Sequence, residues 1–250
     1  MAPPVTSSPA KPATHGLIWT LEWQRATARR RLLGFNILIP LGLVLPVALS
    51  DAPPHHAAAV YAVLFALFAT FGAAIPALRD AERGLVRRLA LLPISARGLL
   101  LERALAGACM DMMQLLPALA VIAWSAGARA APVVSLLAVL AGTLTFANLI
   151  GLWLAAFARS VAEGALVAAV VALLLLHASG VFRTAARGSL AARIEAVAPF
   201  RALHEALLAL NGAGEPAGAP ALLGGLTLLL LLTIIAAPRI VRSLRHADGR

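Results

Sequence analysis

Residues 130–158 read AAPVVSLLAVLAGTLTFANLIGLWLAAFA and contain no charged side chain. An α-helix rises about 1.5 Å per residue, so about 20 residues suffice to cross a hydrocarbon core of about 30 Å. The run also lacks the polar face that a surface helix of a soluble domain would show at helical spacing. It therefore predicts a membrane-spanning helix.

Five further stretches of the chain have the same character. One of them is interrupted only by Asp111, and the others carry no charge. Together with the first run they predict spans at about residues 32–49, 58–78, 104–128, 133–156, 164–182 and 218–238. We therefore predict an all-α fold, a polytopic membrane protein with six transmembrane helices in one domain over residues 15–245.

The composition argues against a soluble protein and against several kinds of site. Charged residues make up only 13% of the chain, whereas about 25% is usual in a soluble domain. The net charge of +10 would suggest nucleic acid as a partner of a soluble protein, but here arginines beside the spans fix the topology, so we expect no nucleic-acid partner. The only lysine, Lys11, does not follow a glycine, which excludes a phosphate-binding loop. The single Cys109 excludes an internal disulfide.

The basic residues are unevenly divided between the two sides of the predicted spans. Sixteen of the 21 flank one side, and five flank the other. Those five are Arg129, Arg183, Arg187, Arg193 and Arg201. Because cytoplasmic loops are richer in Lys and Arg, we predict a multi-pass protein of the cell inner (plasma) membrane with both termini cytoplasmic.

The N-terminal part divides into a tail and a short helix. Residues 1–14 are rich in Pro, Ala and Ser and have few apolar residues, so we predict a disordered cytoplasmic tail. Residues 15–31 combine Trp19 and Trp23 with a basic cluster that ends at Arg31. This pattern predicts an interfacial helix with its indole rings at headgroup level, which serves either as a topology anchor or as a contact for a partner.

The segment between the fifth and sixth predicted spans, residues 183–215, is more than a simple loop. Apolar residues recur at helical spacing before and after Pro199, and charged residues keep either half from spanning the membrane. Two short amphipathic helices that join near Ala198 and Pro199 fit this pattern. We predict that they form a re-entrant hairpin that dips into the outer leaflet or lies on it.

The connection between the second and third predicted spans, residues 79–97, reads RDAERGLVRRLALLPISAR. Its charged first part leads into an apolar run that closes at Pro93, and Ser95 can cap the helix of the third span. We predict a cytoplasmic helix–turn–helix on the membrane surface. Its helical part begins with Glu82, Arg83 and Gly84 and continues with Arg87 and Arg88.

Two sets of motifs resemble the permeases of ABC-2 type transporters. The cytoplasmic connection of that family matches Glu82-Arg83-Gly84 and then Leu91-Leu92-Pro93-Ile94-Ser95, with Leu85 where the family often has threonine. The re-entrant hairpin that the family places before its last span is similar to Ser179-Gly180, Ala198-Pro199-Phe200 and His204-Glu205-Ala206-Leu207. The resemblance covers about residues 15–245.

This resemblance implies the membrane-spanning permease subunit of an ATP-binding cassette exporter, which moves a substrate outward. Such a subunit is no enzyme and binds no cofactor, because ATP and Mg²⁺ are held by a separate cytoplasmic ABC ATPase subunit. Two permeases pair in the lipid membrane as a homodimer or heterodimer. The resemblance further implies that residues 79–97 act as a coupling helix that docks on the ATPase; the alternative is that the arginines there serve topology alone.

One group of polar residues lies inside the predicted spans. Asp111 is costly within a bilayer and should face protein or water, with Gln114 on the same helix face. Asn148 and Thr145 of the fourth span are possible hydrogen-bond partners. These residues either line the substrate path or form a buried contact between helices. The second interpretation is favoured, because Asp111 is only about two turns from the start of the third predicted span.

Other functions receive less support from the sequence. His177 and the pair His55 and His56 have no cysteine or carboxylate at ligand spacing, so we expect no metal site. A membrane-embedded enzyme would need a nucleophile–base pair or a metal motif, and no catalytic residue is identified. A secondary transporter often has internal repeats and several intramembrane ions. The prevalence of Ala, Leu and Val in every span favours a lipid-like or amphiphilic cargo.

Overall fold

The computed structural model describes residues 16–28, 30–89, 91, 94–183, 185–186, 188–214 and 220–246. Six of its helices are long and apolar enough to cross a membrane. They are α2 (Arg30–Ala48), α3 (Pro54–Glu82), α5 (Ala96–Ser125), α6 (Ala130–Phe157), α7 (Val161–Ala178) and α10 (Pro220–His246). No strand occurs among the described residues. The prediction of an all-α fold with six apolar spanning helices is confirmed.

Four short helices complete the described part of the chain. They are α1 (Leu17–Ala28), α4 (Leu85–Leu89), α8 (Leu190–Val197) and α9 (Arg201–Leu210). The helices predicted within residues 15–31 and on both sides of Pro199 are therefore present, whereas their interfacial and re-entrant positions stay predictions. The predicted disordered tail, residues 1–14, lies outside the described residues, as does Pro93 of the connection.

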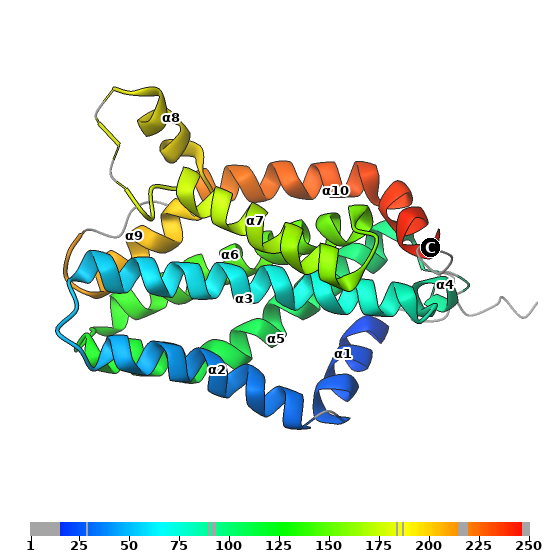
Figure 1. The fold of residues 1–250 in the computed structure, drawn as a ribbon, viewed down its shortest axis with the longest axis horizontal. Coiled ribbons are helices and arrows are strands. Elements are labelled where there is room, and N and C mark those ends of the chain that lie inside the picture. Colours follow the sequence, from blue (N-terminus) through cyan, green and yellow to red (C-terminus); the bar gives the residue numbers. More distant parts are fainter. Residues whose placement is uncertain are drawn as a thin grey trace, which may run out of the picture.

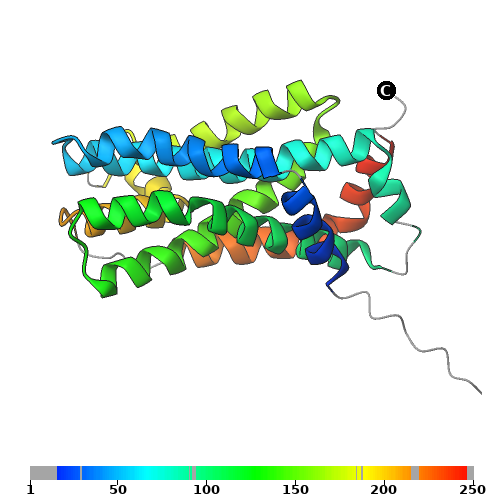
Figure 2. The same cartoon turned by 90° about the horizontal axis from the view of Figure 1, so that it is seen from below.

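The long helices run along the longest axis of the molecule, and consecutive ones run in opposite directions (Figure 1). As a result, α4, the junction between α6 and α7, and the end of α10 lie together. The opposite end holds α9 and the junctions α2–α3 and α5–α6. We call these the α4 end and the α9 end. The short helix α1 lies across the bundle near the α4 end (Figure 2).

The helix α6 is the centre of the bundle. It packs along α3, α5 and α10 and touches α9 at one end. The helix α2 packs along α5 and makes much less contact with α3, while α7 packs mainly on α3. The peripheral position of α2 and α7 leaves many of their apolar side chains exposed, as expected for surfaces that meet lipid or another apolar partner.

Small residues bring α3 and α6 close together. The face of α3 that meets the core carries Ala66, Ala69, Ala73 and Ala77, all buried. Opposite them, a Cβ atom added to Gly151 of α6 would lie 2.6 Å from the carbonyl oxygen of Thr70 and 2.8 Å from the Cβ of Ala73. Only glycine fits there, in the manner of the small-residue interfaces that let membrane helices approach closely.

The helix α3 contains one internal proline, Pro76. Because proline has no N–H group, the carbonyl of Gly72, four residues earlier, loses its helical hydrogen-bond partner. Membrane helices tolerate such a position where neighbouring groups satisfy the freed carbonyl. Pro76 therefore marks the weakest turn of α3, between the part packed on Gly151 and the part that leads to α4.

The helix α5 begins before the span predicted at about residues 104–128. Ser95 is its N-cap, and its hydroxyl oxygen accepts a hydrogen bond of 3.0 Å from the N–H of Gly98, as predicted. The helix begins at Ala96, ahead of the uncharged run that starts at Ala104, because capping and not hydrophobicity sets its first turn. Asp111 lies near the middle of α5 and about two turns after Ala104, where the predicted span begins.

The alternating helix directions make the predicted orientation testable. Reporter fusions at Pro53 and at Gly214, both near the α9 end, should report an outside location, and a fusion at Arg88 of α4 should report inside. The reason is the excess of arginine around the α4 end. An enzymatic reporter that is active on only one side of the membrane measures this. An outside signal at Arg88 would overturn the assigned orientation.

Candidate functional site

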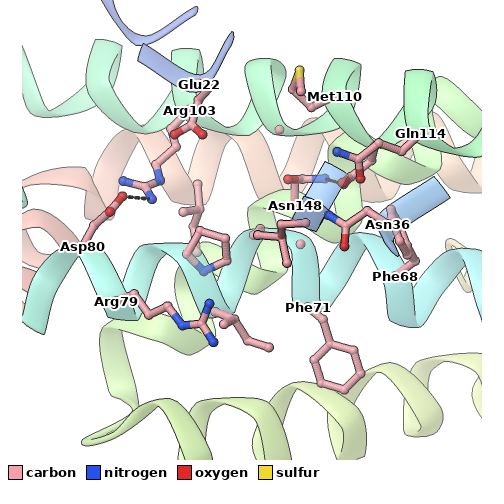
Figure 3. A pocket seen from close by; sticks show the side chains of 18 of the residues that line it. Glu22, Asn36, Phe68, Phe71, Arg79, Asp80, Arg103, Met110, Gln114 and Asn148 are labelled. Atoms are coloured by element: carbon pink, nitrogen blue, oxygen red, sulfur yellow. Dashed lines mark hydrogen bonds and ion pairs between the residues drawn. The ribbon is translucent and has the colours of Figure 1, made fainter. Parts of the chain in front are cut away.

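A cavity of about 680 Å³ extends from the α4 end toward the middle of the bundle. Its walls come from α2, α3 and α5, with α1 and α4 at its mouth and α6 at its base (Figure 3). Along α3 the lining runs from Arg83 back to Phe68, a rise of about 22 Å. The volume lies in the range of about 300–1,000 Å³ that small-molecule sites occupy.

The lining changes in character along this length. The charged residues belong to the α4 end, and they are Glu22, Arg79, Asp80, Arg83, Arg88 and Arg103. The apolar wall is formed by Leu32, Leu33, Ile39, Phe68, Phe71, Ile75, Leu85, Met110 and Leu152. Uncharged amides and one carboxyl group form the inner part, namely Asn36, Asp111, Gln114 and Asn148. The cavity is thus amphipathic, with its net positive charge at the mouth.

Three polar residues predicted within the spans meet at the inner part of the cavity. The side-chain amide of Asn148 donates hydrogen bonds to Oδ2 of Asp111 at 2.8 Å and to the carbonyl of Leu144 at 2.9 Å. Gln114 is buried one turn along α5 from Asp111 and lines the same cavity. The predicted partner Thr145 is not part of this group, because its hydroxyl donates to the carbonyl of Ala141 on its own helix.

Two glycines make room for the Asp111–Asn148 pair. A Cβ on Gly72 of α3 would lie 2.8 Å from Oδ1 of Asp111, and a Cβ on Gly107 of α5 would overlap Oδ1 of Asn148. The pair therefore ties α5 to α6 while α3 passes close by. The sequence left two interpretations of these residues, a buried contact between helices and a position in the substrate path. In the structure they form the buried contact and also lie in the cavity wall. Their role in a substrate path stays a prediction.

An ion pair closes one side of the cavity mouth. Nη2 of Arg103 on α5 lies 2.5 Å from Oδ2 of Asp80 in the last turns of α3. Both side chains are 12% exposed, so water screens the pair less than it would a surface pair. The bond joins the two helices that flank α4. In the sequence, Arg103 counts only among the sixteen basic residues on the predicted cytoplasmic side, and no spacing pattern indicates an ion pair between residues of consecutive spans.

The five residues predicted to form one connecting helix are divided by Gly84. This residue has φ +66°, a left-handed value that favours glycine. Glu82 and Arg83 end α3 and do not begin a new helix, so that part of the prediction was wrong. The short α4 buries Val86 and Leu89 and exposes the arginines between them.

The charged residues of this connection also face different surroundings. Arg83 and Arg88 line the cavity, whereas Glu82 and Arg87 are exposed and lie outside its lining. Gly84 lies at the turn between α3 and α4 and does not line the cavity. The connection therefore offers one set of side chains to the cavity and another to the surface at the α4 end.

The α9 end is closed by packed side chains. Phe200 is buried and meets Phe146 of α6 edge-on, with ring centroids 5.9 Å apart. Nε of Arg201 donates to Oε1 of Glu205 at 2.6 Å within α9. Burial, and then the nearby His55, lower the pKa of His204, while Glu205 opposes this. Across the described residues, no group of three or more His, Cys, Asp and Glu side chains could hold a metal ion.

Comparison with known proteins gives one family. The model of the family described as ABC-2 type transporter matches residues 17–210. The match contains the cavity residues, the connection through α4 and both short helices α8 and α9. No curated protein matches the chain.

Proposed function

The chain belongs to the ABC-2 type transporter family, and on that premise we propose that it moves a substrate outward with ATP hydrolysed by a separate subunit. It is the membrane domain of an ABC transporter permease, a transport subunit that is not itself catalytic. Family members generally pair with a cytoplasmic ATPase subunit. The proposal concerns the direction of transport and the source of energy.

The observation that carries the proposal is the position of the cavity mouth beside α4. A cavity of ligand size opens at the same end of the bundle as the exposed Glu82 and Arg87. The α4 connection is short and joins α3 to α5, two walls of the cavity. A partner that docks on the connection and moves can therefore displace both walls, since packed helices transmit such shifts.

A second permease, identical or different, would complete the transporter. The exposed apolar residues of α2 and α7 support this, because both helices lie at the edge of the bundle. Examples are Phe35, Leu38 and Leu43 on α2 and Leu166, Val170 and Leu174 on α7. Membrane lipid covers whatever part of these surfaces the second permease leaves open.

The division of labour between the subunits gives a direct test. The purified chain alone should show no ATP hydrolysis above the background of mock purifications, because it has no phosphate-binding loop. When the chain is purified in mild detergent from the membranes of the cells that naturally produce it, an ABC ATPase subunit should co-purify. The resulting complex should hydrolyse ATP. Hydrolysis by the isolated chain, after removal of contaminating ATPases, would contradict the proposal.

Asp111 gives one reason to test a proton-coupled secondary transporter as well. A carboxyl group in the inner wall of a cavity within the spans can carry a proton. Transport in inverted vesicles distinguishes the two functions. An ABC exporter needs ATP and works without a pH gradient, whereas a secondary transporter works without ATP. Uptake that follows the pH gradient alone would favour the second function.

A further inference from the structure

We propose that the cavity at the α4 end binds an amphiphile with an anionic headgroup and an apolar chain. The headgroup would lie at Arg79, Arg83 and Arg88, and the apolar chain would lie against Phe68, Phe71 and Ile39. This inference rests on the proposed transport function and specifies its substrate class.

The charges at the mouth favour an anion. Arg103 is paired with Asp80. The other three arginines of the lining, Arg79, Arg83 and Arg88, are exposed, and none of them is ion-paired with a described residue. Guanidinium groups offer several N–H donors in a planar fork, which suits phosphate and carboxylate oxygens.

The uneven distribution of charged groups along the lining sets the direction in which an amphiphile would lie. Glu22 and Asp80 lie at the mouth, and Asp80 is engaged by Arg103. Asp111 lies at the inner part beside Gly72, which is about 16 Å along α3 from Arg83. An anionic headgroup is therefore drawn to the arginines of the mouth and not to the inner part, whose described lining has no basic side chain.

The apolar wall lies directly beside the free arginines. Figure 3 shows Arg79 and Phe71 extending from the same side of α3, with Ile75 of the lining between them in sequence. Across the cavity, α2 contributes Leu33 and Ile39. One continuous wall thus carries a cationic and an apolar section, which matches an amphiphile better than a free inorganic anion.

The loose contact between α2 and α3 gives this ligand a route from the membrane. α2 packs on α5 and makes little contact with α3, although both helices line the cavity. Phe68 and Phe71 are only half-buried on this side. An amphiphile can therefore enter the cavity from the lipid between α2 and α3. Its headgroup stays at the α4 end, at the level of the lipid headgroups on that side of the membrane.

Binding of defined probes to the chain in phosphatidylcholine nanodiscs tests this. We expect radiolabelled dodecyl phosphate to bind about tenfold or more tightly than dodecyltrimethylammonium, which has the same chain length and opposite charge. The variant Arg79→Gln should weaken dodecyl phosphate binding about tenfold, and Arg79→Lys should restore part of it. The matched control Arg87→Gln, on the same connection but outside the cavity lining, should bind as the unchanged protein does.

Three outcomes would overturn the inference. Equal binding by the Arg79→Gln variant and the unchanged protein would show adsorption to lipid only. Equal weakening by Arg87→Gln would show a diffuse charge effect. Binding of inorganic phosphate as tight as that of dodecyl phosphate would show a free-anion site without use of the apolar wall.

The assay uses no ATPase, so its failure differs from failure of the proposed function. If an ATPase subunit associates with the chain but dodecyl phosphate does not bind at Arg79, the substrate class alone is wrong. If dodecyl phosphate binds but no ATPase associates, the ATP-driven mechanism is wrong and the binding site remains.

Discussion

Replacing Gly151 with alanine should destabilise the folded protein by about 1–3 kcal/mol, the usual cost of forcing extra atoms into a packed core. The added Cβ would lie 2.6 Å from the Thr70 carbonyl oxygen, a backbone atom that cannot rotate away. α3 and α6 would have to move apart where Gly151 meets Thr70, Ala73 and Ala74. The loss of the monodisperse size-exclusion peak on heating the detergent-solubilised protein measures the effect.

The matched control for this substitution is Gly224→Ala in α10. A Cβ at Gly224 has no neighbouring atom within 4 Å, and alanine is a better helix former than glycine by about 1 kcal/mol. The control should therefore be as stable as the unchanged protein or slightly more stable. Equal stability of the two alanine variants would mean that α3 and α6 do not meet as closely as the structure has them.

Reversing the charge of Arg87 should reduce both association with the ATPase subunit and cargo transport by about tenfold or more. A glutamate there would face the acidic groups of the ATPase that bind this basic connection, and like charges across an interface cost several kcal/mol. Arg87 is exposed on α4 and lies outside the cavity lining. Arg87→Glu therefore tests docking without touching the cavity, and the double variant with Arg83→Glu should lose at least as much. Co-purification of the ATPase and ATP-dependent uptake into inverted vesicles are the two measurements.

The control for docking is Arg193→Glu in α8, the same charge change near the opposite end of the molecule. It should leave association with the ATPase unchanged. Membrane insertion should be retained in both variants, because most of the basic residues near the α4 end remain. Unchanged co-purification and transport in the Arg87→Glu variant would show that the arginines of this connection serve topology only.

Hydrophobicity predicted the long helices well but their ends less well. An uncharged run indicates which residues can lie in lipid. A helix ends where its terminal N–H and C=O groups find hydrogen-bond partners outside the helix. The helix α5 therefore extends back through Arg103 and Arg97 to the cap at Ser95. In the same way, α3 continues through Asp80 to Glu82 until Gly84 takes a left-handed conformation.

The candidate site could be predicted only in part. Asp111 and Asn148 stand out in the sequence because polar side chains are rare in spans, but their hydrogen bond depends on how α5 and α6 rotate against each other. Gly72 and Gly107 were the residues in the sequence that could have indicated this contact. Each leaves space for one of the two side chains, Gly72 for Asp111 and Gly107 for Asn148. The ion pair of Asp80 with Arg103 left no such signal.

The proline of α3 divides that helix into two segments with different mechanical roles. The segment before Pro76 is packed on α6 through the Gly151 contact with Thr70, Ala73 and Ala74, whereas the segment after Pro76 carries the ion pair with Arg103 and leads into α4. A displacement of α4 would therefore act first on the part of α3 beyond Pro76, because the turn from Gly72 to Pro76 lacks one helical hydrogen bond. That turn lies beside Asp111. Such a displacement would change the width of the cavity mouth, whose lining includes Arg79, Arg83 and Arg88.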